Sequence, residues 1–372
     1  MKPARRSAGA PGSLVRAWWQ RKPTALSRWL RPLSSLYQAV SARKRRQARP
    51  RPAPVPVIVV GNLVVGGAGK TPTVIALVQA LKAAGHRPGV ISRGFGRDGG
   101  AARGVHAGDN AQEVGDEPLL IARRTGAPVW VARARLAAAQ GLCDAHPEVD
   151  VLVSDDGLQH HALARDAALV VFDDRGAGNG LLLPAGPLRE PLPQWLPPRT
   201  WVLYTGTRAS TALPGPVVQR TAARVWSLAA WWQGARVVDG ADGSVASGGG
   251  PLPLSHLRGR RLLAMAGLGD PEKFFTLLEH AGLEIDRLPL PDHHPYRTLP
   301  WAPGTTEVIT TEKDAIKLDP RRLGCAPRIW VLPLDFQLPE SLLAELQQAL
   351  FGSAARRSPL PPLPPLPPLP PP

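Results

Sequence analysis

The sequence predicts an α/β protein: a mostly parallel sheet flanked by helices, followed by a second, smaller α/β domain. Three observations support this prediction. Short apolar runs alternate with helix-length segments from residue 55 onward. A glycine-rich loop joins the first apolar run to the first of these helices. A chain of 372 residues is also long enough for two domains.

The first domain is predicted from apolar strands separated by helices. Val57–Val60 is a buried type of strand, and Thr71–Ala84 is a helix that Gly85 ends. The alternation then continues as strands at 89–92, 128–131, 151–153, 169–172 and 201–204, with helices at 118–124 and 134–145. Strands that alternate with helices run in parallel, so helices are expected on both faces of the sheet.

Changes in composition divide the rest of the chain into a linker, a second domain and a tail. Residues 206–258, rich in Ala, Gly and Trp, are expected to link the domain at 55–205 to a second domain at 259–352. Its expected elements are strands at 262–266 and 308–309 and helices at 271–281 and 339–350. Residues 353–372 are almost wholly Pro and Leu, which favours polyproline II and disorder. Whether this tail binds a protein partner is left open.

Residues 1–54 form a basic arm, which carries most of the net charge of +16. The arm has 14 Lys or Arg and no Asp or Glu, which leaves 31 basic and 29 acidic residues elsewhere. Pro32 must break or restart its central helix. Apolar residues recur there at helical spacing, namely Leu26, Trp29, Leu30, Leu33, Tyr37 and Val40. This pattern favours a helix that lies on an anionic membrane surface over one packed on the protein's own core.

Several classes of protein are excluded by what the sequence lacks. Cys143 and Cys325 cannot build a disulfide framework, and no Cys/His cluster suggests a metal site. No apolar run reaches the ~18 residues that span a bilayer. The basic N-terminus has no compact apolar stretch of the signal-peptide kind, so we expect the chain in the cytoplasm.

A glycine-rich loop follows the first strand and reads GNLVVGGAGKT over residues 61–71. Small residues let its backbone curl so that N–H groups point at phosphate oxygens; these are Gly66, Gly67, Ala68 and Gly69. Lys70 would reach the β- and γ-phosphates, and Thr71 would ligate Mg²⁺. The motif predicts a P-loop, with one departure: Val64 stands where the usual pattern has glycine.

Two carboxylates, Asp155 and Asp156, end the apolar strand 151–153. In a parallel sheet, ligands bind at the carboxyl ends of strands, so either carboxylate is placed to hold Mg²⁺. A simple Asp-Asp-Gly turn is the alternative, and the strand context makes it the weaker one. His160 and His161 follow, but adjacent histidines point in different directions and do not predict a zinc site.

A third carboxylate, Asp116, opens the helix expected at 118–124. It is either a helix cap or, with a tuned pKa, the base that an acceptor hydroxyl needs in phosphoryl transfer. A histidine from elsewhere would tune such a base or relay its proton. His293 and His294, in a proline-bounded loop, are the candidates, and the pattern does not decide between them.

Six strings, taken in order, resemble the tetraacyldisaccharide 4′-kinase family: VIVVGNLVVGGAGKTP, ISRGFG, VGDEPLLIARRTGAPVWV, DVLVSDDGLQHHAL, LLPAGPLREP and ITTEKDAIKL. They cover roughly residues 55–335, and an amphipathic segment of the family's kind precedes them. P-loops without the first glycine are typical of this family, which accounts for Val64.

The resemblance implies transfer of the γ-phosphate of ATP to the 4′-hydroxyl of tetraacyldisaccharide 1-phosphate, a lipid-linked disaccharide, to form lipid IVA. It implies that Asp116 is the general base, paired with His293, and that Asp155 and Asp156 lie beside Mg²⁺ and the reacting groups. It adds Arg93 as a site residue and gives the metal ligands as Thr71, Asp155 and Glu190. The enzyme would act peripherally at the cytoplasmic face of the bacterial inner membrane.

Two other functions share parts of this pattern. A P-loop ATPase or GTPase acting as a switch or metallochaperone often carries Lys before the glycine pair, where this chain has Val65. A nucleic-acid-binding protein would use the basic arm, but such arms are usually polar throughout, so no nucleic acid is expected. Residues 311–314, Thr-Glu-Lys-Asp, are either close to the nucleotide or only a helix cap.

Overall fold

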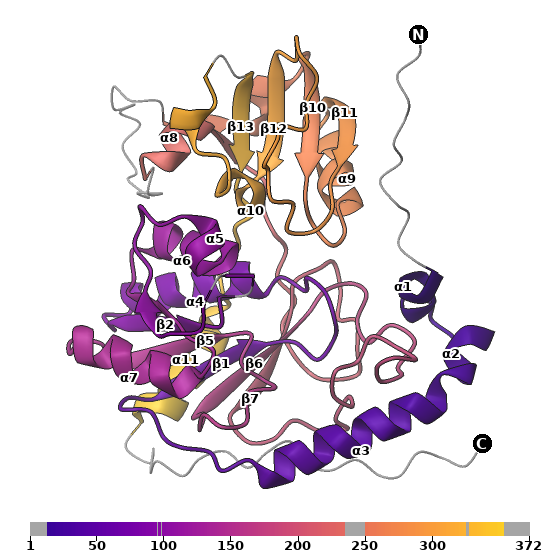
Figure 1. Ribbon diagram of the computed structural model, residues 1–372, viewed down its shortest axis with the longest axis vertical. Coiled ribbons are helices and arrows are strands. Elements are labelled where there is room, and N and C mark those ends of the chain that lie inside the picture. Colours follow the sequence, from indigo (N-terminus) through magenta and orange to yellow (C-terminus); the bar gives the residue numbers. More distant parts are fainter. Residues whose placement is uncertain (1–12, 95, 98, 235–249, 325–326, 353–372) are drawn as a thin grey trace.

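The computed structural model describes residues 13–94, 96–97, 99–234, 250–324 and 327–352. It contains two sheets stacked end to end, with a long N-terminal helix running below the first sheet (Figure 1). The tail at 353–372, whose role the sequence left open, lies outside the described residues, as do residues 1–12 of the arm.

The first sheet has seven strands in the order β3-β4-β2-β5-β1-β6-β7. All neighbours pair in parallel except β3 with β4. The bounds are β1 Val57–Gly61, β2 Pro88–Ser92, β3 Arg103–Gly104, β4 Val129–Val131, β5 Val151–Asp155, β6 Ala167–Phe172 and β7 Thr200–Tyr204. The predicted parallel sheet is therefore confirmed, and β1, which leads into the glycine-rich loop, lies in its interior between β5 and β6.

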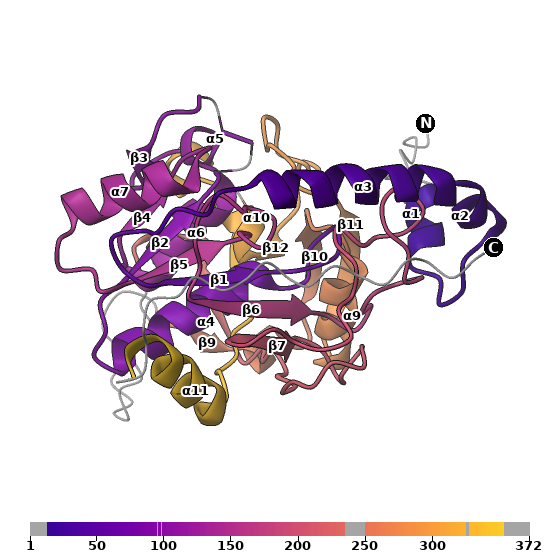
Figure 2. The ribbon, with the colours of Figure 1, turned by 90° about the horizontal axis from the view of Figure 1, so that it is seen from below.

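Helices cover both faces of this sheet, as predicted. Successive β1 side chains alternate between faces, so Ile58 packs into one apolar cluster and Val59 into the other. The first cluster contains side chains of α4 Lys70–Ala83, α6 Asp116–Thr125 and α11 Glu340–Phe351, whereas the second contains α7 Arg135–Ala145 and part of the arm. Figure 2 shows α11 and α3 on opposite sides of the sheet. The short α5, Ala111–Val114, precedes α6.

The second sheet has six strands in the order β11-β10-β12-β13-β8-β9. Its first four strands are parallel, and β8 and β9 complete it in antiparallel fashion. The bounds are β8 Arg224–Ser227, β9 Leu252–Pro253, β10 Arg261–Ala266, β11 Glu284–Pro289, β12 Glu307–Thr311 and β13 Arg328–Leu332. Its helices are α8 Leu228–Trp232, α9 Glu272–His280 and α10 Glu312–Ala315, with 3-10 turns at Leu254–Leu257 and Pro320–Arg322.

The domain boundaries differ from the predicted ones in two places. The expected linker, 206–258, supplies β8, α8 and β9 to the second sheet, because Trp226 and Trp231 are buried there rather than marking a loose connection. Helix α11, expected in the second domain, returns to the first, where Trp201 on β7 donates a 2.5 Å hydrogen bond to Glu345. The chain thus passes between the two units twice.

The described part of the arm forms α1 Ser13–Trp18, α2 Ala25–Trp29 and α3 Arg31–Gln47, and Pro32 lies in the first turn of α3, as a restart requires. One side of the arm packs on the first domain: Tyr37 donates a 2.9 Å hydrogen bond to the Arg189 carbonyl, so this residue faces inward. The other side exposes Val15, Leu26, Trp29, Leu33, Leu36 and Val40. None of the described helices is both long and apolar enough to cross a membrane.

Candidate active site

The glycine-rich loop lies between β1 and α4, as its motif requires. Gly69 precedes α4 in a left-handed conformation, with φ of 86°, which favours glycine. A Cβ at this position would collide with the guanidinium of Arg220 and the hydroxyl of Thr205. The loop is therefore tightly packed at the start of α4, where the helix dipole and free N–H groups favour phosphate.

The departure at Val64 has a structural reason. Val64 is buried and forms an antiparallel bridge with Leu188. The Val65 N–H donates to the Pro187 carbonyl at 2.8 Å, and the Arg189 N–H donates to the Leu63 carbonyl at 2.7 Å. The first half of the loop is thus an extended segment that needs no glycine. Its pairing with residues 187–189 brings Arg189 and Glu190 to the site.

Lys70, the first residue of α4, is held by the loop itself. Its Nζ donates to Asn62 Oδ1 at 3.3 Å, and Asn62 in turn donates to the Gly66 carbonyl at 3.2 Å. The Lys70 ammonium also lies 3.7 Å from Asp156 Oδ1. Asn62 is fully buried, so this arrangement fixes the lysine at the mouth of the loop.

The two carboxylates at the end of β5 lie in different environments. Asp155 is 2% exposed, and burial, helped by the charges of Glu117 and Asp156, raises its pKa to about 7. One of its oxygens accepts from Ser92 Oγ at 3.3 Å, and the other has no hydrogen-bond partner among the described residues. Asp156 is also mostly shielded from water, which by itself would raise its pKa, but Lys70 and Arg189 outweigh this and lower it. The pKa values of these adjacent carboxylates are thus shifted in opposite directions.

Two arginines surround this edge of the sheet. Arg135, 4% exposed, donates from Nη2 to the Asp155 carbonyl at 3.1 Å. Arg93 is exposed just after β2, and its charge acts on His160, whose pKa is lowered first by burial and then by Arg135 and Arg93. Arg93 therefore contributes to a positively charged rim.

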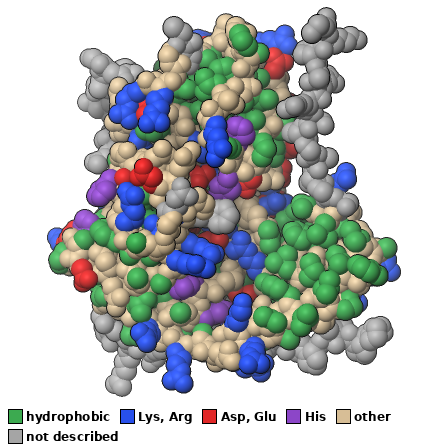
Figure 3. Space-filling model, in the orientation of Figure 1, with side chains coloured by type: hydrophobic (Ala, Val, Ile, Leu, Met, Phe, Trp, Pro, Cys, Tyr) green, Lys and Arg blue, Asp and Glu red, His purple; other side chains and the backbone are tan. Residues whose placement is uncertain are grey.

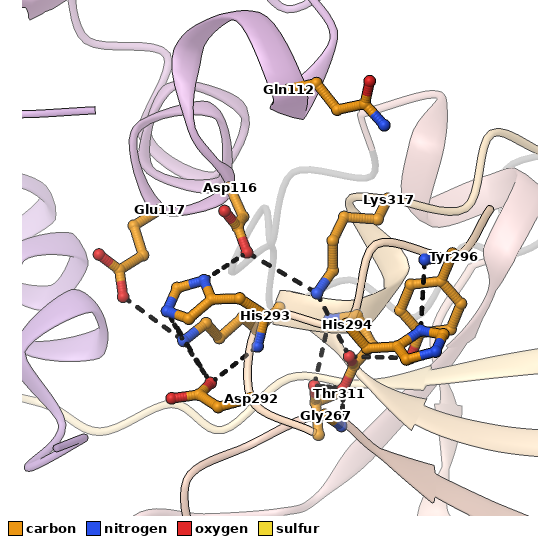
Figure 4. A network of polar contacts seen from close by, with 12 residues as sticks. Gln112, Asp116, Glu117, Gly267, Asp292, His293, His294, Tyr296, Thr311 and Lys317 are labelled. Carbon is orange, nitrogen blue, oxygen red and sulfur yellow. Dashed lines mark hydrogen bonds and ion pairs between the residues drawn. The ribbon is translucent and has the colours of Figure 1, made fainter. Parts of the chain in front are cut away.

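Asp116 and His293 come together across the boundary between the two domains (Figure 4). His293 Nδ1 lies 2.9 Å from Asp116 Oδ2, and Lys317 Nζ lies 3.7 Å from the same oxygen. Burial would raise the pKa of Asp116, but the His293 hydrogen bond and the Lys317 charge outweigh it and leave the pKa below its ordinary value. Asp116 is thus ionised at neutral pH and available as a proton acceptor.

The structure selects His293 over its neighbour as the partner of Asp116. His293 has a φ of 58°, a left-handed backbone that turns its ring toward α6. His294 instead accepts a 3.2 Å hydrogen bond from the Tyr296 N–H and packs edge-on against the Tyr296 ring. Of the two candidates, His293 alone is placed against the carboxylate.

The predicted metal ligands lie in separate surroundings. Thr71 is half-buried in the first turn of α4, close to the loop. Glu190 is 6% exposed, and burial raises its pKa. Its nearest ion-pair partner is Arg45 of α3 at 3.8 Å, and its two oxygens accept no hydrogen bond within the described ranges. Glu190 thus connects the arm to the segment that flanks the loop.

Residues 311–314 form the cap of α10, which was one of the two interpretations. Thr311 Oγ1 accepts from the Asp314 N–H at 3.3 Å, and buried Asp314 accepts from the Gly267 N–H at 2.9 Å. Lys313 in this segment and Lys317 just after α10 both lie against the Asp116–His293 pair. The sequence interpretation included Lys313 only as part of the segment 311–314 and gave neither lysine a role beside the pair, because their contacts with it join distant parts of the chain.

Two further arginines that the sequence interpretation missed touch the phosphate loop. Arg175 Nη2 donates to the Gly67 carbonyl at 2.7 Å, and Arg175 also pairs with Asp173 at 2.8 Å. Arg220 Nη2 donates to Thr205 Oγ1 at 3.3 Å, beside Gly69. Asp173 in turn pairs at 2.8 Å with Lys273 of α9, so this cluster joins the loop to the second domain.

Comparisons with known proteins identify the family of the chain. The family model LpxK, described as tetraacyldisaccharide-1-P 4′-kinase, matches residues 26–351. The chain is 51% identical over 345 residues to a tetraacyldisaccharide 4′-kinase of Leptothrix cholodnii, covering 91% of this chain and 95% of the relative. For the same enzyme of Methylibium petroleiphilum, identity is 48% over 363 residues, with 95% and 98% covered.

A solved structure is also similar. It is the "apo" form of LpxK from Aquifex aeolicus in complex with ATP, with a TM-score of 0.68 and 26% identity, covering 88% of this chain and 100% of that chain. The family model spans most of the sequence, and its match includes the phosphate loop, the strand-end carboxylates and both members of the Asp116–His293 pair. The chain belongs to the tetraacyldisaccharide 4′-kinase family.

Proposed function

We propose that this enzyme transfers the γ-phosphate of ATP to the 4′-hydroxyl of tetraacyldisaccharide 1-phosphate, forming lipid IVA in lipid A biosynthesis. The observation that supports it most directly is an ionised carboxylate, Asp116, paired with His293 at the edge of the sheet that carries the phosphate loop. Glu117, the next residue, acts electrostatically on Asp155, so the start of α6 and the end of β5 are neighbours. A proton acceptor and a phosphate site therefore lie in one region, as the transfer of a phosphoryl group to an alcohol requires.

In the proposed reaction the 4′-oxygen forms a bond to the γ-phosphorus, and the bond from that phosphorus to the β–γ bridging oxygen breaks. ADP leaves with the electron pair, and the hydroxyl proton passes to Asp116. Lys70 stabilises the charge that develops on the phosphoryl oxygens. The base contributes a further factor of about 10²–10⁴, because the transition state is loose and most catalysis is positioning.

We also propose that the site takes Mg²⁺ with the nucleotide. Asp155 supplies the observation: it carries a buried oxygen with no hydrogen-bond partner in the described chain and a pKa of about 7, both of which a cation would relieve. Thr71 and Glu190 are the other proposed ligands. The described residues contain no cluster of three or more His, Cys, Asp and Glu arranged to hold a metal, but Mg²⁺ usually relies on one or two carboxylates plus phosphates and water. Asp155, Thr71 and Glu190 would hold the ion, which would neutralise negative charge on the phosphates of the nucleotide.

We propose that the arm holds the enzyme at an anionic membrane surface, at the cytoplasmic face of the bacterial inner membrane. Its outward side is apolar: Trp29 is 78% exposed and Leu36 is 63% exposed. Figure 3 shows hydrophobic side chains gathered in one broad patch over α1, α2 and the start of α3. Exposed basic residues in the last turn of α3, namely Lys44 and Arg46, add attraction to anionic headgroups.

The test is to incubate the purified chain with Mg–ATP and tetraacyldisaccharide 1-phosphate and to analyse the lipid by mass spectrometry. Conversion of the lipid to the bis-phosphate, with one ADP released per product, is the expected result. Lys70→Ala serves as the inactive control. ATP hydrolysis that proceeds without lipid phosphorylation would instead favour a P-loop switch ATPase, and a gel shift with RNA in place of vesicle binding would favour the nucleic-acid alternative.

A further inference from the structure

Lys313 contacts the outer nitrogen of His293, on the side of the ring away from Asp116. The Lys313 Nζ to His293 Nε2 distance is 3.2 Å, while His293 Nδ1 lies 2.9 Å from Asp116 Oδ2. Figure 4 shows the imidazole lying between Asp116 and Asp292, so both ring nitrogens have partners. Lys313 belongs to α10, whose position is fixed by the Thr311 cap.

The chemistry of these groups decides where the imidazole proton lies. A lysine ammonium has three N–H donors and no acceptor, so a nitrogen that it touches at hydrogen-bond distance must offer a lone pair. His293 Nε2 is then the acceptor. In a neutral imidazole the other nitrogen carries the hydrogen, so Nδ1–H donates to the carboxylate of Asp116.

We propose that Lys313 is a positioning residue that keeps His293 neutral, with its hydrogen on Nδ1. In this state His293 donates a hydrogen bond to Asp116 and cannot receive a proton from it, because Nδ1 already carries its hydrogen and Lys313 keeps that hydrogen from moving to Nε2. The proton taken from the acceptor hydroxyl therefore stays on Asp116 until product leaves. This inference rests on the proposed role of Asp116 as the base.

Neighbouring carboxylates keep Lys313 positively charged. Burial would lower the pKa of Lys313, but the carboxylates of Glu117 and Asp292, at 3.6 and 3.1 Å, outweigh it and raise the pKa. Lys313 thus remains a cation throughout the neutral range. A second positive charge on the imidazole 3.2 Å away would meet repulsion and would break the hydrogen bond to Nε2.

Opposing influences act on the protonation of His293. The hydrogen bond with Asp116 raises the pKa of the imidazole, burial and the Lys313 charge lower it, and the charges of Asp116 and Asp292 raise it again, so that the pKa stays above its ordinary value and Lys313 limits how far it rises. Among the described residues, the titratable groups around the pair come from α6, from the loop after β11 and from α10 and the residues that follow it. They include Asp116, Glu117, Asp292, His294, Lys313, Asp314 and Lys317. Of the two lysines, Lys317 approaches the carboxylate of Asp116, whereas Lys313 contacts the ring of His293. Removing the Lys313 charge should therefore favour the imidazolium.

The test is ¹⁵N NMR of the histidine side chains of the full-length enzyme across pH, with the His293 signals identified by their loss in His293→Ala. The unmodified enzyme should show a protonated Nδ1 and an unprotonated Nε2 above the pKa of the imidazole. In Lys313→Met the pKa of His293 should rise by about one unit. The acidic limb of the profile of kcat/KM against pH should shift to higher pH by the same amount. Lys313→Arg keeps a charged donor and should restore the pKa and the pH profile of the unmodified enzyme. The control is Arg261→Met, which removes an exposed cation paired with Asp286 and should change neither the pKa of His293 nor the pH profile.

Finding the hydrogen on Nε2 in the unmodified enzyme would overturn the proposal, and this result does not depend on whether any variant folds. An unchanged pKa of His293 in a folded Lys313→Met enzyme would also contradict it. The proposed function fails separately: an Asp116→Ala enzyme with near-normal kcat would remove the base while leaving the tautomer of His293 as observed.

Discussion

The two halves of this active site are built in different ways. The half that receives the nucleotide comes from one domain: the loop at 61–71 and the carboxylates at the end of β5 lie on neighbouring strands of a single sheet. The half that receives the acceptor hydroxyl spans two domains, because Asp116 and His293 are 177 positions apart and lie on opposite sides of the boundary. The first half is therefore assembled by the fold of one sheet, and the second depends on how two folded units are placed.

Helix α6 makes several of the contacts that fix the two domains relative to each other. At its first residue Asp116 meets His293, and in its last turn Arg124 pairs with Glu312 and Asp335, each at 2.5 Å. Glu312 also accepts a 2.9 Å hydrogen bond from the indole N–H of Trp231 on α8. A helix of the first domain is thus attached at both ends to the second, and this comparison leads to four predictions.

The largest effect is expected in the single-domain half. Lys70→Ala should lower kcat by about 10³-fold or more, because it removes the positive charge that meets the β- and γ-phosphates. Steady-state kinetics with a thermal unfolding scan would measure it. Lys82→Met is the matched control, since Lys82 lies on the same helix about 18 Å away and donates a 2.8 Å hydrogen bond to the Thr125 carbonyl, away from the loop. Near-normal turnover in Lys70→Ala would contradict the assignment of the loop.

The two-domain half should respond cooperatively. Asp116→Ala and His293→Ala should each lower kcat by about 10²–10⁴-fold, with little change in KM for ATP, because the phosphate loop is untouched. The double variant should lose little more than Asp116→Ala alone, since the histidine acts through the carboxylate. Losses that multiply would show that the two residues act independently, and His293 would then be a structural residue of its loop.

Breaking the far end of α6 tests the placement directly. Arg124→Met leaves two carboxylates without their cation, and burial already raises the pKa of Glu312, so the variant should lose about 3–5 kcal/mol of unfolding free energy. The exposed pair of Arg261 with Asp286 supplies a control, since water screens this pair and Arg261→Met should leave the unfolding free energy nearly unchanged. Chemical denaturation of both variants would measure the difference. Equal stabilities would mean that Arg124 does not hold the domains together.

The smallest effect is expected at the membrane arm, which lies outside both halves. Deleting the arm would also disturb Arg189 through the Tyr37 contact, so point substitutions on its outer side are cleaner. Replacing Trp29, Leu33 and Leu36 with serine should weaken binding to anionic vesicles about tenfold or more while leaving kcat with dispersed substrate unchanged. Vesicle flotation at two salt concentrations would test this, with Phe351→Ser on α11 as the control on the opposite side of the sheet. Undiminished flotation would place the membrane contact elsewhere.

Much of the fold followed from local patterns. The apolar runs, their spacing and the glycine-rich loop predicted the parallel first sheet correctly, because burial on both faces of a strand leaves a signal in consecutive residues. The region 206–258 gave a misleading pattern, because short strands and buried tryptophans there resemble a linker in composition. The packing of one side of the arm on the protein was only the less favoured alternative for a related reason: helical spacing shows that a face is apolar but not what covers it.

The sequence by itself determined the phosphate loop and the carboxylates of β5, since each is a short contiguous segment placed by one strand. Only the tertiary structure decided that His293 rather than His294 meets Asp116, and that Lys313 occupies the other nitrogen of the ring. It also decided that Val64 forms part of an extended pair with Leu188. Such contacts join residues that are distant along the chain, and side-chain chemistry acts only over a few ångströms, so they exist only once the two domains have packed together.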